Sequence, residues 1–374
     1  MTYTATAPDL EHFLCDTDEV LDRIDAIDPR AYDKSRNELG GATTWLGPFL
    51  THGITDTREV AERVLEPPGG EPRSPGSCYR LLFELAWREF FHRTWQLEGE
   101  EVFGDMHRAQ HGVVSEKLPC AVLSADTGID VVDATIAHLL EQGTMHNHAR
   151  MWTAAIVCNI GRSGWWQGAR WLHHHLLDGD LASNTLSWQW VAGTFSNKRY
   201  LANQENIDRF SRSRQSGSWL DLSYDEVESM PAPERFSERA EPTLPMTLHG
   251  RPIERLEGGI ALRSIWHLDP RWEHTMEREL VFVDTDLIAA WPLSAKRWRF
   301  IAHWAKRCGA DIVHGSASAL AEAAREATVV RREYPACRDW PGQVEERRWL
   351  YPMPDKEFAS FSKYWKQVRG SLGL

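Results

Sequence analysis

The sequence predicts a mainly α-helical chain with a small α/β domain, built on a parallel sheet, at its C-terminal end. Three features lead to this fold class. Apolar residues recur at helical spacing through most of residues 1–212, whereas residues 213–262 are rich in Ser, Pro, Glu and Arg. From residue 263 onward, short apolar runs alternate with helical segments, which is typical of a parallel α/β unit. We therefore expect a helical domain over 1–212, a linker over 213–262 and an α/β domain over 263–374.

Composition and charge narrow the class of protein. The 374 residues suffice for two or three domains, and the 18 tryptophans supply both core packing and aromatic surfaces for stacking. The net charge of −12 is uneven, with −15 over residues 1–250 and +3 over residues 251–374. Because DNA binding depends on Lys and Arg that neutralise phosphates, we expect only weak non-specific affinity for DNA.

The cysteines and the apolar runs indicate the compartment. Six cysteines are scattered without CxxC spacing, so we expect reduced thiols and no iron–sulfur cluster. No apolar run approaches the ~20 residues of a membrane span, and the acidic N-terminus resembles neither a signal nor a transit peptide. The prediction is a soluble, cytoplasmic protein.

In chain order, residues 8–28 form an acidic amphipathic helix that we expect to dock on the rest of the chain. Residues 30–55 contain glycines and threonines just before a helix that starts with proline. That arrangement fits a capped helix, and it also fits a phosphate site at a helix N-terminus. After a Pro/Gly loop at 66–77, residues 78–96 form a helix. Another helix covers 124–142.

The helix over 78–96 places Glu84 and Trp87 on one face. A carboxylate and a large ring together are consistent with a core helix that carries a salt-bridged Glu. They are also consistent with one wall of a binding pocket.

The stretch 143–190 carries the densest chemistry. Asn147, Arg150 and Met151 stand at i, i+3 and i+4 of a helix, so their side chains project together. A second helix, 167–177, ends at Asp178-Gly179-Asp180, and Asn184 and two tryptophans follow. This set of amides, carboxylates, guanidinium and indoles suits a planar cofactor with many heteroatoms. We expect no metal site, since the adjacent histidines at 173–175 point in different directions.

The C-terminal part alternates strands and helices: strands at 280–285, 311–315 and 328–334, and helices at 294–309 and 318–327. It lacks a GxGxxG loop, so the sequence does not support a dinucleotide site there.

MHNHARM at 145–151, followed by LLDGDLASN at 176–184 and WQW at 188–190, resembles the flavin-binding core of the photolyase/cryptochrome family. The resemblance extends over residues 30–210. It implies a helical domain that binds FAD non-covalently. Typical members carry an α/β antenna domain before the helical one, whereas this chain has its only α/β unit at the C-terminal end, as a shortened and relocated counterpart. We therefore expect no second, light-harvesting chromophore.

The resemblance also implies a set of cofactor contacts. Arg150 would pair with Asp178 beside the isoalloxazine ring, and Asn184 would lie near the ring nitrogen that takes up a proton. Trp45 and Gly47 replace the Arg and Ser that the family usually has in the phosphate segment, so fewer charge-assisted contacts to phosphate follow. The full set implied for FAD is Tyr32, Thr43, Thr44, Leu46, Asn147, Arg150, Asp178, Asp180 and Asn184.

On the substrate side, the resemblance implies light-driven electron transfer from reduced FAD to a cyclobutane pyrimidine dimer in damaged DNA. The matching substrate and catalytic residues are Glu84, Trp87, Asn147, Met151 and Trp190. His148 stands in place of a common Arg, which removes a phosphate contact.

Trp188 and Trp165 match the two inner members of the family's electron-transfer chain. The outer tryptophan has no counterpart near Gly112, and Trp166 or Trp171 are the available substitutes.

Three functions stay open. A light-driven DNA lyase explains the substrate-side residues together. A cryptochrome-like light sensor needs only flavin and a tryptophan path, and it accommodates the acidic charge. A flavoenzyme that acts on a small molecule would reuse the same pocket. The oligomeric state does not follow from the sequence.

Overall fold

The computed structural model describes residues 7–352, 358 and 360–374. The chain forms two compact units, each assembled from separate stretches. Unit 1 comprises the described residues up to Asp9, Arg30–Thr43 and Leu97–Thr243, and unit 2 comprises Leu10–Pro29, Thr44–Gln96 and the described residues from Leu244 onward. These units interleave along the chain, whereas the sequence predicts consecutive domains divided at 212 and 262, and that division stays a prediction.

Unit 1 is helical apart from one short antiparallel pair, β1 (Leu118–Pro119) with β2 (Arg239–Ala240). Helix α7 ends at Gly143, whose left-handed backbone (φ 82°) lets the chain turn directly toward α8. The Gly143 carbonyl accepts a hydrogen bond from the Leu177 N–H at 2.8 Å. This bond joins the segment just before α8 to the loop between α9 and α10. The helices are α2 (Pro29–Ser35, whose first residue belongs to unit 2), η3 (Gly99–Phe103), α6 (Cys120–Leu123), α7 (Asp130–Gln142), α8 (Asn147–Ala155), a π-helical turn (Ile156–Ile160), α9 (Trp165–His175), α10 (Leu181–Ala192), α11 (Gln204–Ser211), α12 (Tyr224–Ser229) and η5 (Glu234–Phe236).

The helical part of unit 2 is organised around α5 (Tyr79–Glu98), which confirms the helix expected at 78–96. Residues 8–28 form η1 (Leu10–Phe13) and α1 (Thr17–Asp25) rather than one helix, because Asp16 caps the second helix by accepting from the Glu19 N–H at 3.0 Å. The remaining helices of this part are α3 (Gly47–Thr51), α4 (Thr57–Leu65), η2 (Pro75–Cys78), α16 (Phe361–Val368) and η7 (Arg369–Leu372).

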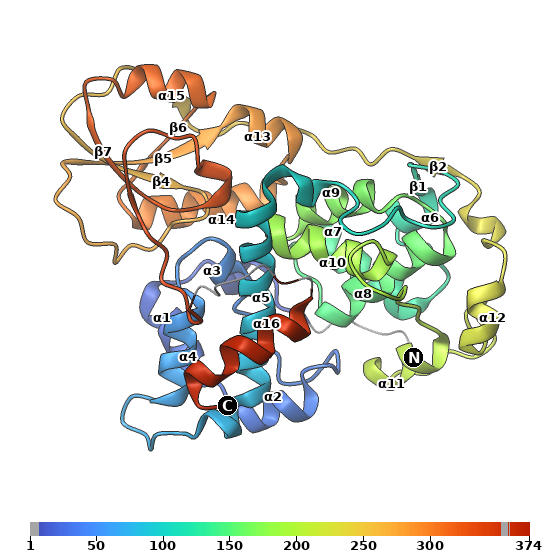
Figure 1. Cartoon of the computed structure of the whole chain (residues 1–374). Helices are drawn as coiled ribbons and strands as arrows, with labels where there is room; N and C mark the ends of the chain where they lie inside the picture. Colours follow the sequence, from blue (N-terminus) through green and yellow to red (C-terminus); the bar gives the residue numbers. More distant parts are fainter. Residues whose placement is uncertain (1–6, 353–357, 359) are drawn as a thin grey trace. The chain divides into compact units, whose positions relative to one another are not determined.

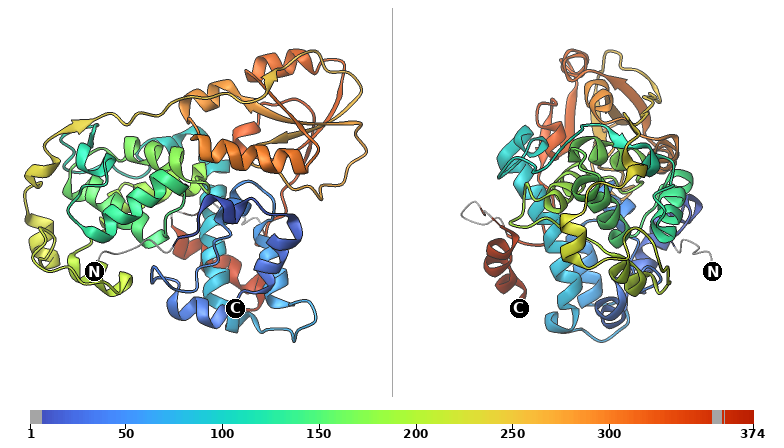
Figure 2. Two further views of the ribbon diagram at one scale, coloured as in Figure 1. Left: turned by 180° about the vertical axis from the view of Figure 1, so that it is seen from behind. Right: turned by 90° about the vertical axis from the view of Figure 1, so that its right-hand side faces the viewer.

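Unit 2 also contains a six-stranded parallel sheet in the order β3-β6-β5-β4-β7-β8. The strands are β3 (Arg251–Pro252), β4 (Gly259–Ser264), β5 (Arg278–Asp284), β6 (Asp311–Gly315), β7 (Thr328–Arg332) and β8 (Gln343–Glu345). Its helices are α13 (Thr285–Ala290), α14 (Ala295–Arg307), α15 (Ala317–Ala323) and η6 (Pro335–Cys337). Figures 1 and 2 show α14 and α15 on opposite sides of the sheet, as right-handed crossovers in opposite directions require.

The fold class is confirmed: the chain is mainly helical with a small parallel α/β part. The strands expected at 280–285, 311–315 and 328–334 correspond to β5, β6 and β7. The expectation that 213–262 is a linker needs correction, because this range contains α12 and the strands β3 and β4, and β4 is central in the sheet. The strand was missed because β4 has only six residues and directly follows Gly258. A run this short does not differ clearly in length or composition from the polar segment before it.

Three further findings concern the part of the chain that the structure describes. No helix there is both long and apolar enough to cross a membrane. No group of three or more His, Cys, Asp or Glu side chains in the described ranges could hold a metal ion. All six cysteines lie in these ranges, and none of them forms a disulfide.

Candidate functional site

The N-terminus of α8 is fixed by His146. Its Nδ1 accepts a hydrogen bond from the His148 N–H at 3.1 Å, so the ring's Nε2–H donates to the Arg36 carbonyl at 3.1 Å. Burial, together with the neighbouring His148, lowers the pKa of His146 to about 4. This histidine is therefore neutral at pH 7 and acts as a cap rather than as a charged ligand.

His148 is buried and stacks on Phe210, with ring centroids 4.4 Å apart. Burial, followed by the charge of Arg36, lowers its pKa to about 4. A neutral, stacked ring at this position offers no charge to a phosphate, in line with the contact that the sequence predicts to be lost here.

Arg150 links α8 to the loop after α9. Its Nη2 donates to both carboxylate oxygens of Asp178 at 2.9 Å, and its Nε donates to the Met145 carbonyl at 2.9 Å. The pair is partly accessible, with 24% of the Arg150 side chain and 18% of the Asp178 side chain exposed. The structure thus brings these two residues together as the resemblance implies, and their role toward a cofactor stays a prediction.

Two further polar residues lie at the start of α10, and one of them connects it to α9. Asp180 is buried at the N-cap of α10 and accepts from the Ser183 N–H at 2.7 Å. Asn184, half-buried on the first turn of α10, donates from Nδ2 to the Ala169 carbonyl at 2.9 Å. These bonds fix the directions of both side chains, which is how a site keeps its shape before a ligand arrives.

Asn147 and Met151 share one face of α8, as their spacing predicts. The Asn147 Nδ2 lies 3.8 Å from the Met151 Sδ. Asn147 is exposed and Met151 is half-buried, so this face is accessible to a ligand.

The predicted electron-transfer tryptophans lie on α9 and α10. Trp188 is 2% exposed, and its ring packs on the backbone of α9, because a Cβ added to Gly168 would lie 2.4 Å from the ring. Trp165 is buried, and its indole Nε1–H donates to Asp105 Oδ1 at 2.7 Å. The ring of Trp166 lies 5.6 Å from that of Trp165, centroid to centroid, in an edge-to-face arrangement.

Trp190, in the last turn of α10, is half-buried and faces Tyr200, with ring centroids 6.0 Å apart. Trp171 is buried and its ring contacts His175, with centroids 5.8 Å apart. Of the two substitutes for an outer tryptophan, Trp166 has a ring that contacts the ring of Trp165.

The predicted phosphate segment begins in unit 1. Ser35 holds it, since its hydroxyl donates to the Ala31 carbonyl and accepts from the Ala42 N–H, both at 3.0 Å. Gly41 passes so close to the Ser35 carbonyl that a Cβ would collide with it. The Thr43 hydroxyl is buried without a hydrogen-bond partner, and Tyr32 is half-buried on α2.

The rest of the predicted set belongs to unit 2. Thr44 accepts from the Leu46 N–H at 3.5 Å, and Leu46 is buried. Glu84 and Trp87 lie half-buried on α5, one turn apart. Trp87 stacks face to face on Phe361 of α16, with ring centroids 3.7 Å apart and an angle of 13° between the planes.

The residues of unit 1 fit a flavin. A buried hydroxyl without a partner at Thr43, an accessible Arg–Asp pair and a half-buried amide at Asn184 supply the mixture of donors and acceptors that a heterocycle with a pyrophosphate tail needs. Gly168, Asp105 and Phe361 were not predicted from the sequence. An isolated glycine inside a helix signals close packing, so Gly168 could have been suspected, whereas no pattern marks the other two.

Part of the chain is similar to a known protein family. Residues 81–232 match the profile of the FAD binding domain of DNA photolyase. The chain is 34% identical over 173 residues to the deoxyribodipyrimidine photo-lyase of Streptomyces griseus, covering 45% of this chain and 36% of that protein. It is 30% identical over 190 residues to the chloroplastic/mitochondrial cryptochrome DASH of Ostreococcus tauri, covering 50% of this chain and 33% of that protein. The chain thus spans about a third of the length of these curated relatives.

Two solved structures are also similar. A cryptochrome of Synechocystis sp. PCC6803 is 22% identical with a TM-score of 0.46, covering 63% of this chain and 49% of that chain. A bacterial class III photolyase from Agrobacterium tumefaciens is 20% identical with a TM-score of 0.43, covering 59% of this chain and 54% of that chain.

Proposed function

We propose that this chain, which belongs to the photolyase/cryptochrome family, binds FAD non-covalently and uses it to repair cyclobutane pyrimidine dimers in DNA under blue light. The observation that carries the proposal is the Arg150–Asp178 pair, held between α8 and the α9–α10 loop inside the stretch that matches the FAD-binding profile. A paired arginine and aspartate, accessible from one side, orient a polar heterocycle without leaving either charge unbalanced.

This chain's own residues position the cofactor. Arg150, Asp178 and Asn184 hold the ring system, and Thr43 donates its hydroxyl to the phosphate part. Asp180 keeps the start of α10 in place. When bound, FAD supplies the light-driven electron chemistry, and the protein supplies position and electrostatics. The full set proposed for FAD remains Tyr32, Thr43, Thr44, Leu46, Asn147, Arg150, Asp178, Asp180 and Asn184.

The proposed substrate contacts are Glu84, Trp87, Asn147, Met151 and Trp190. A dimer must leave the base stack to reach the flavin, and aromatic walls compensate for the lost stacking by roughly 1–3 kcal/mol per base. Glu84 and Asn147 would accept and donate hydrogen bonds to the bases. The net charge of −12 predicts that undamaged DNA binds weakly and more weakly as salt rises.

A cryptochrome-like light sensor is the second candidate. The observation that favours it is the Trp87–Phe361 stack, because one face of the proposed aromatic wall is already covered by this chain's own side chain. A sensor needs the flavin and the tryptophan path through Trp188 and Trp165, but it needs no base at Trp87.

The first experiment tests the cofactor. The purified protein is incubated with FAD, desalted and denatured, and the supernatant is analysed by chromatography. Asp178→Asn and Arg150→Gln should each lose FAD, and Ser187→Ala, at an exposed position on α10, should retain it. A parent protein that retains no FAD after incubation with excess cofactor contradicts the proposal.

Repair is then measured on an oligonucleotide with one thymine dimer, under blue light, at low salt and with the flavin reduced. Glu84→Gln should retain FAD and repair at least about tenfold more slowly, since a hydrogen bond to a charged group is worth about 1.5–3 kcal/mol. If the FAD-loaded parent neither binds nor repairs this oligonucleotide, the repair function is wrong and the sensor leads.

A further inference from the structure

Unit 2 contains a concave site that none of the residues proposed for FAD lines. A cavity of about 290 Å³ lies where β4, β7 and β8 end. Ser264, Trp266 and His267 reach it from the end of β4, and Arg332 and Arg347 reach it from the ends of β7 and β8. Helices α3, α4 and α5, the loop between α3 and α4, and the segments that follow β4, β7 and β8 supply the rest of its lining.

The position of this cavity in the sheet is informative. From β4 the chain moves to β5 and then β6 on one side, and it returns to β7 and then β8 on the other. The strand order therefore reverses between β4 and β7. In open parallel sheets, ligands bind outside the carboxyl ends of the strands at such a reversal, because the two connections diverge and leave a crevice. The cavity occupies that position.

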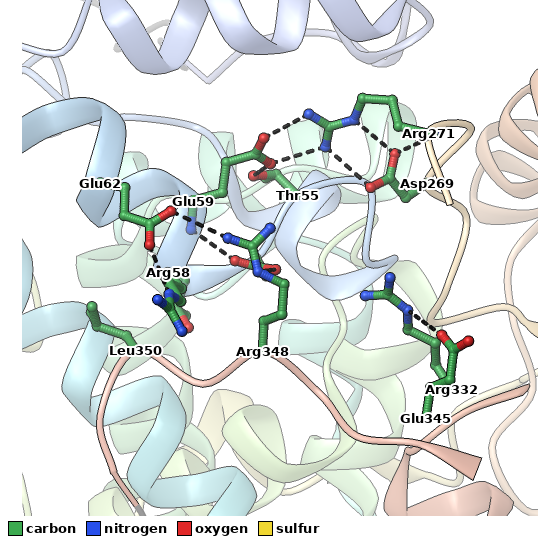
Figure 3. Close-up of polar contacts among 12 residues, drawn as sticks. Thr55, Arg58, Glu59, Glu62, Asp269, Arg271, Arg332, Glu345, Arg348 and Leu350 are labelled. Atoms are coloured by element: carbon green, nitrogen blue, oxygen red, sulfur yellow. Dashed lines mark hydrogen bonds and ion pairs between the residues drawn. The ribbon is translucent and has the colours of Figure 1, made fainter. Parts of the chain in front are cut away.

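The acidic groups of the cavity already have partners, as Figure 3 shows for several of them. Arg271 bridges Glu59 at 2.6 Å and Asp269 at 2.9 Å, and Arg347 pairs with Glu333 at 2.9 Å. Burial opposes ionisation of Glu59, but hydrogen bonds from Arg271 and Thr55 outweigh it and lower the pKa of that carboxyl. The Glu59 carboxylate is therefore charged and paired, and it offers a ligand little.

Several single donor atoms of the cavity make no hydrogen bond, although Arg332 also forms an ion pair with Glu345 at 3.7 Å. The indole Nε1 of Trp266, the Nε of Arg332 and the Nη2 of Arg347 are buried and make no hydrogen bond. Neither ring nitrogen of His267 has a hydrogen-bond partner, although the residue is only 7% exposed. No carboxylate or hydroxyl oxygen of the lining residues, all of which the structure describes, is left in that state. Buried polar groups in folded proteins are nearly always hydrogen-bonded, so a surplus of donors indicates a ligand that brings acceptors.

We propose that this cavity binds the phosphate or carboxylate group of a metabolite-sized molecule, with His267, Arg332 and Arg347 as its donors. Guanidinium groups suit both oxyanions because their N–H groups match the spacing of two oxygens. Trp266 and Tyr334, stacked with ring centroids 4.7 Å apart and planes within 5°, form a rigid wall beside these donors.

The state of His267 agrees with an anion. Burial, followed by the charges of Arg263 and Arg332, lowers the pKa of His267 well below its usual value. The imidazole is therefore neutral at pH 7, with one N–H available to donate. A bound oxyanion would accept from this N–H and from the buried donor atoms of Arg332 and Arg347 that make no hydrogen bond.

The test uses the full chain and two probes, inorganic phosphate and citrate, against sodium chloride at equal ionic strength. Titration calorimetry and the thermal midpoint are measured for each. We expect saturable binding of one probe, with a midpoint that rises as the probe saturates. Phosphate binding without citrate binding identifies a phosphate ligand, and the reverse identifies a carboxylate. If neither probe binds saturably, the proposal is wrong.

Variants locate the site. Arg332→Gln and His267→Asn should each weaken the binding probe by about tenfold or more. Arg58→Gln, on α4 beside the lining residue Glu59 but outside the cavity, should bind as the parent does. Circular dichroism checks the fold of every variant, and Arg347→Gln replaces either of the first two if that one does not fold. Unchanged affinity in the folded cavity variants overturns the assignment. FAD content, measured in the same samples, should stay at the parent level, so failure here leaves the proposed function untouched.

Discussion

At the residue scale, the hydrogen bond between Trp165 and Asp105 suggests how an oxidised tryptophan would be stabilised. The indole Nε1 lies 2.7 Å from a carboxylate oxygen, so a positive charge on the ring would meet a negative charge at hydrogen-bond distance. The same carboxylate could accept the indole proton.

The first prediction follows from this contact. Asp105→Asn keeps the hydrogen bond but removes the charge, so it should slow the light-driven reduction of bound FAD several-fold. The rate is measured from flavin bleaching under blue light with a thiol as external reductant. Trp188→Phe and Trp165→Phe should slow it as well. Parent-like bleaching in Asp105→Asn would mean that this carboxylate plays no part.

Gly168 leads to the second prediction. A methyl group there would lie 2.4 Å from the Trp188 ring, so Gly168→Ala must push the indole away from α9. We expect a loss of unfolding free energy of about 1–3 kcal/mol and slower bleaching of bound FAD. Gly76→Ala is the matched control, because no atom lies within 4 Å of its added Cβ. Equal bleaching rates in both variants would contradict the role of this packing.

The limits of sequence reasoning are visible among these residues. The spacing of Asn147, Arg150 and Met151 predicted a common face, and the contact between Asn147 and Met151 confirms it for these two residues. Pairing of Arg150 with Asp178 came from resemblance, since a contact across 28 residues has no local pattern. Asp105 is 60 residues from Trp165, which no periodicity connects.

At the element scale, the sheet shows why some strands escape detection. β5 reads LVFV and is buried on both faces, as a central parallel strand should be. β4 is equally buried, yet its short IALRS run carries an arginine whose charge is satisfied by Glu279 at 2.6 Å. Because of this charged residue, β4 could not be told from the polar segment before it by its sequence alone.

Helix α16 gives the third prediction. Its Phe361 covers one face of Trp87, so Phe361→Ala should expose that face to a base. We expect tighter binding of dimer-containing DNA and stronger quenching of tryptophan fluorescence by acrylamide. Lys363→Ala, at an exposed position on the same helix, should change neither. If quenching rises while DNA affinity stays the same, Trp87 is not a base-stacking wall.

At the scale of the whole molecule, stability should depend on pH through the buried histidines of unit 1. Burial lowers the pKa of His146 and of His148 to about 4, whereas the pKa of a histidine in an unfolded chain is about 6.5. Between these values the unfolded chain binds protons that the folded chain does not. The stabilisation is therefore complete above pH 6.5 and is lost as the pH falls toward 4, at up to about 1.4 kcal/mol per pH unit for each histidine.

The last prediction isolates one of these histidines. His148→Phe keeps a ring against Phe210 and removes both the titration and a buried Nδ1 that has no hydrogen-bond partner. The variant should therefore lose stability less steeply than the parent between pH 6.5 and about 5, a window above the usual carboxylate range. Denaturant unfolding at several pH values measures the two slopes. His111→Phe, at an exposed position, controls for the substitution itself and should follow the parent. Identical slopes in all three proteins would show that the pKa of His148 is the same in the folded and the unfolded chain. Its burial against Phe210 would then not govern its charge.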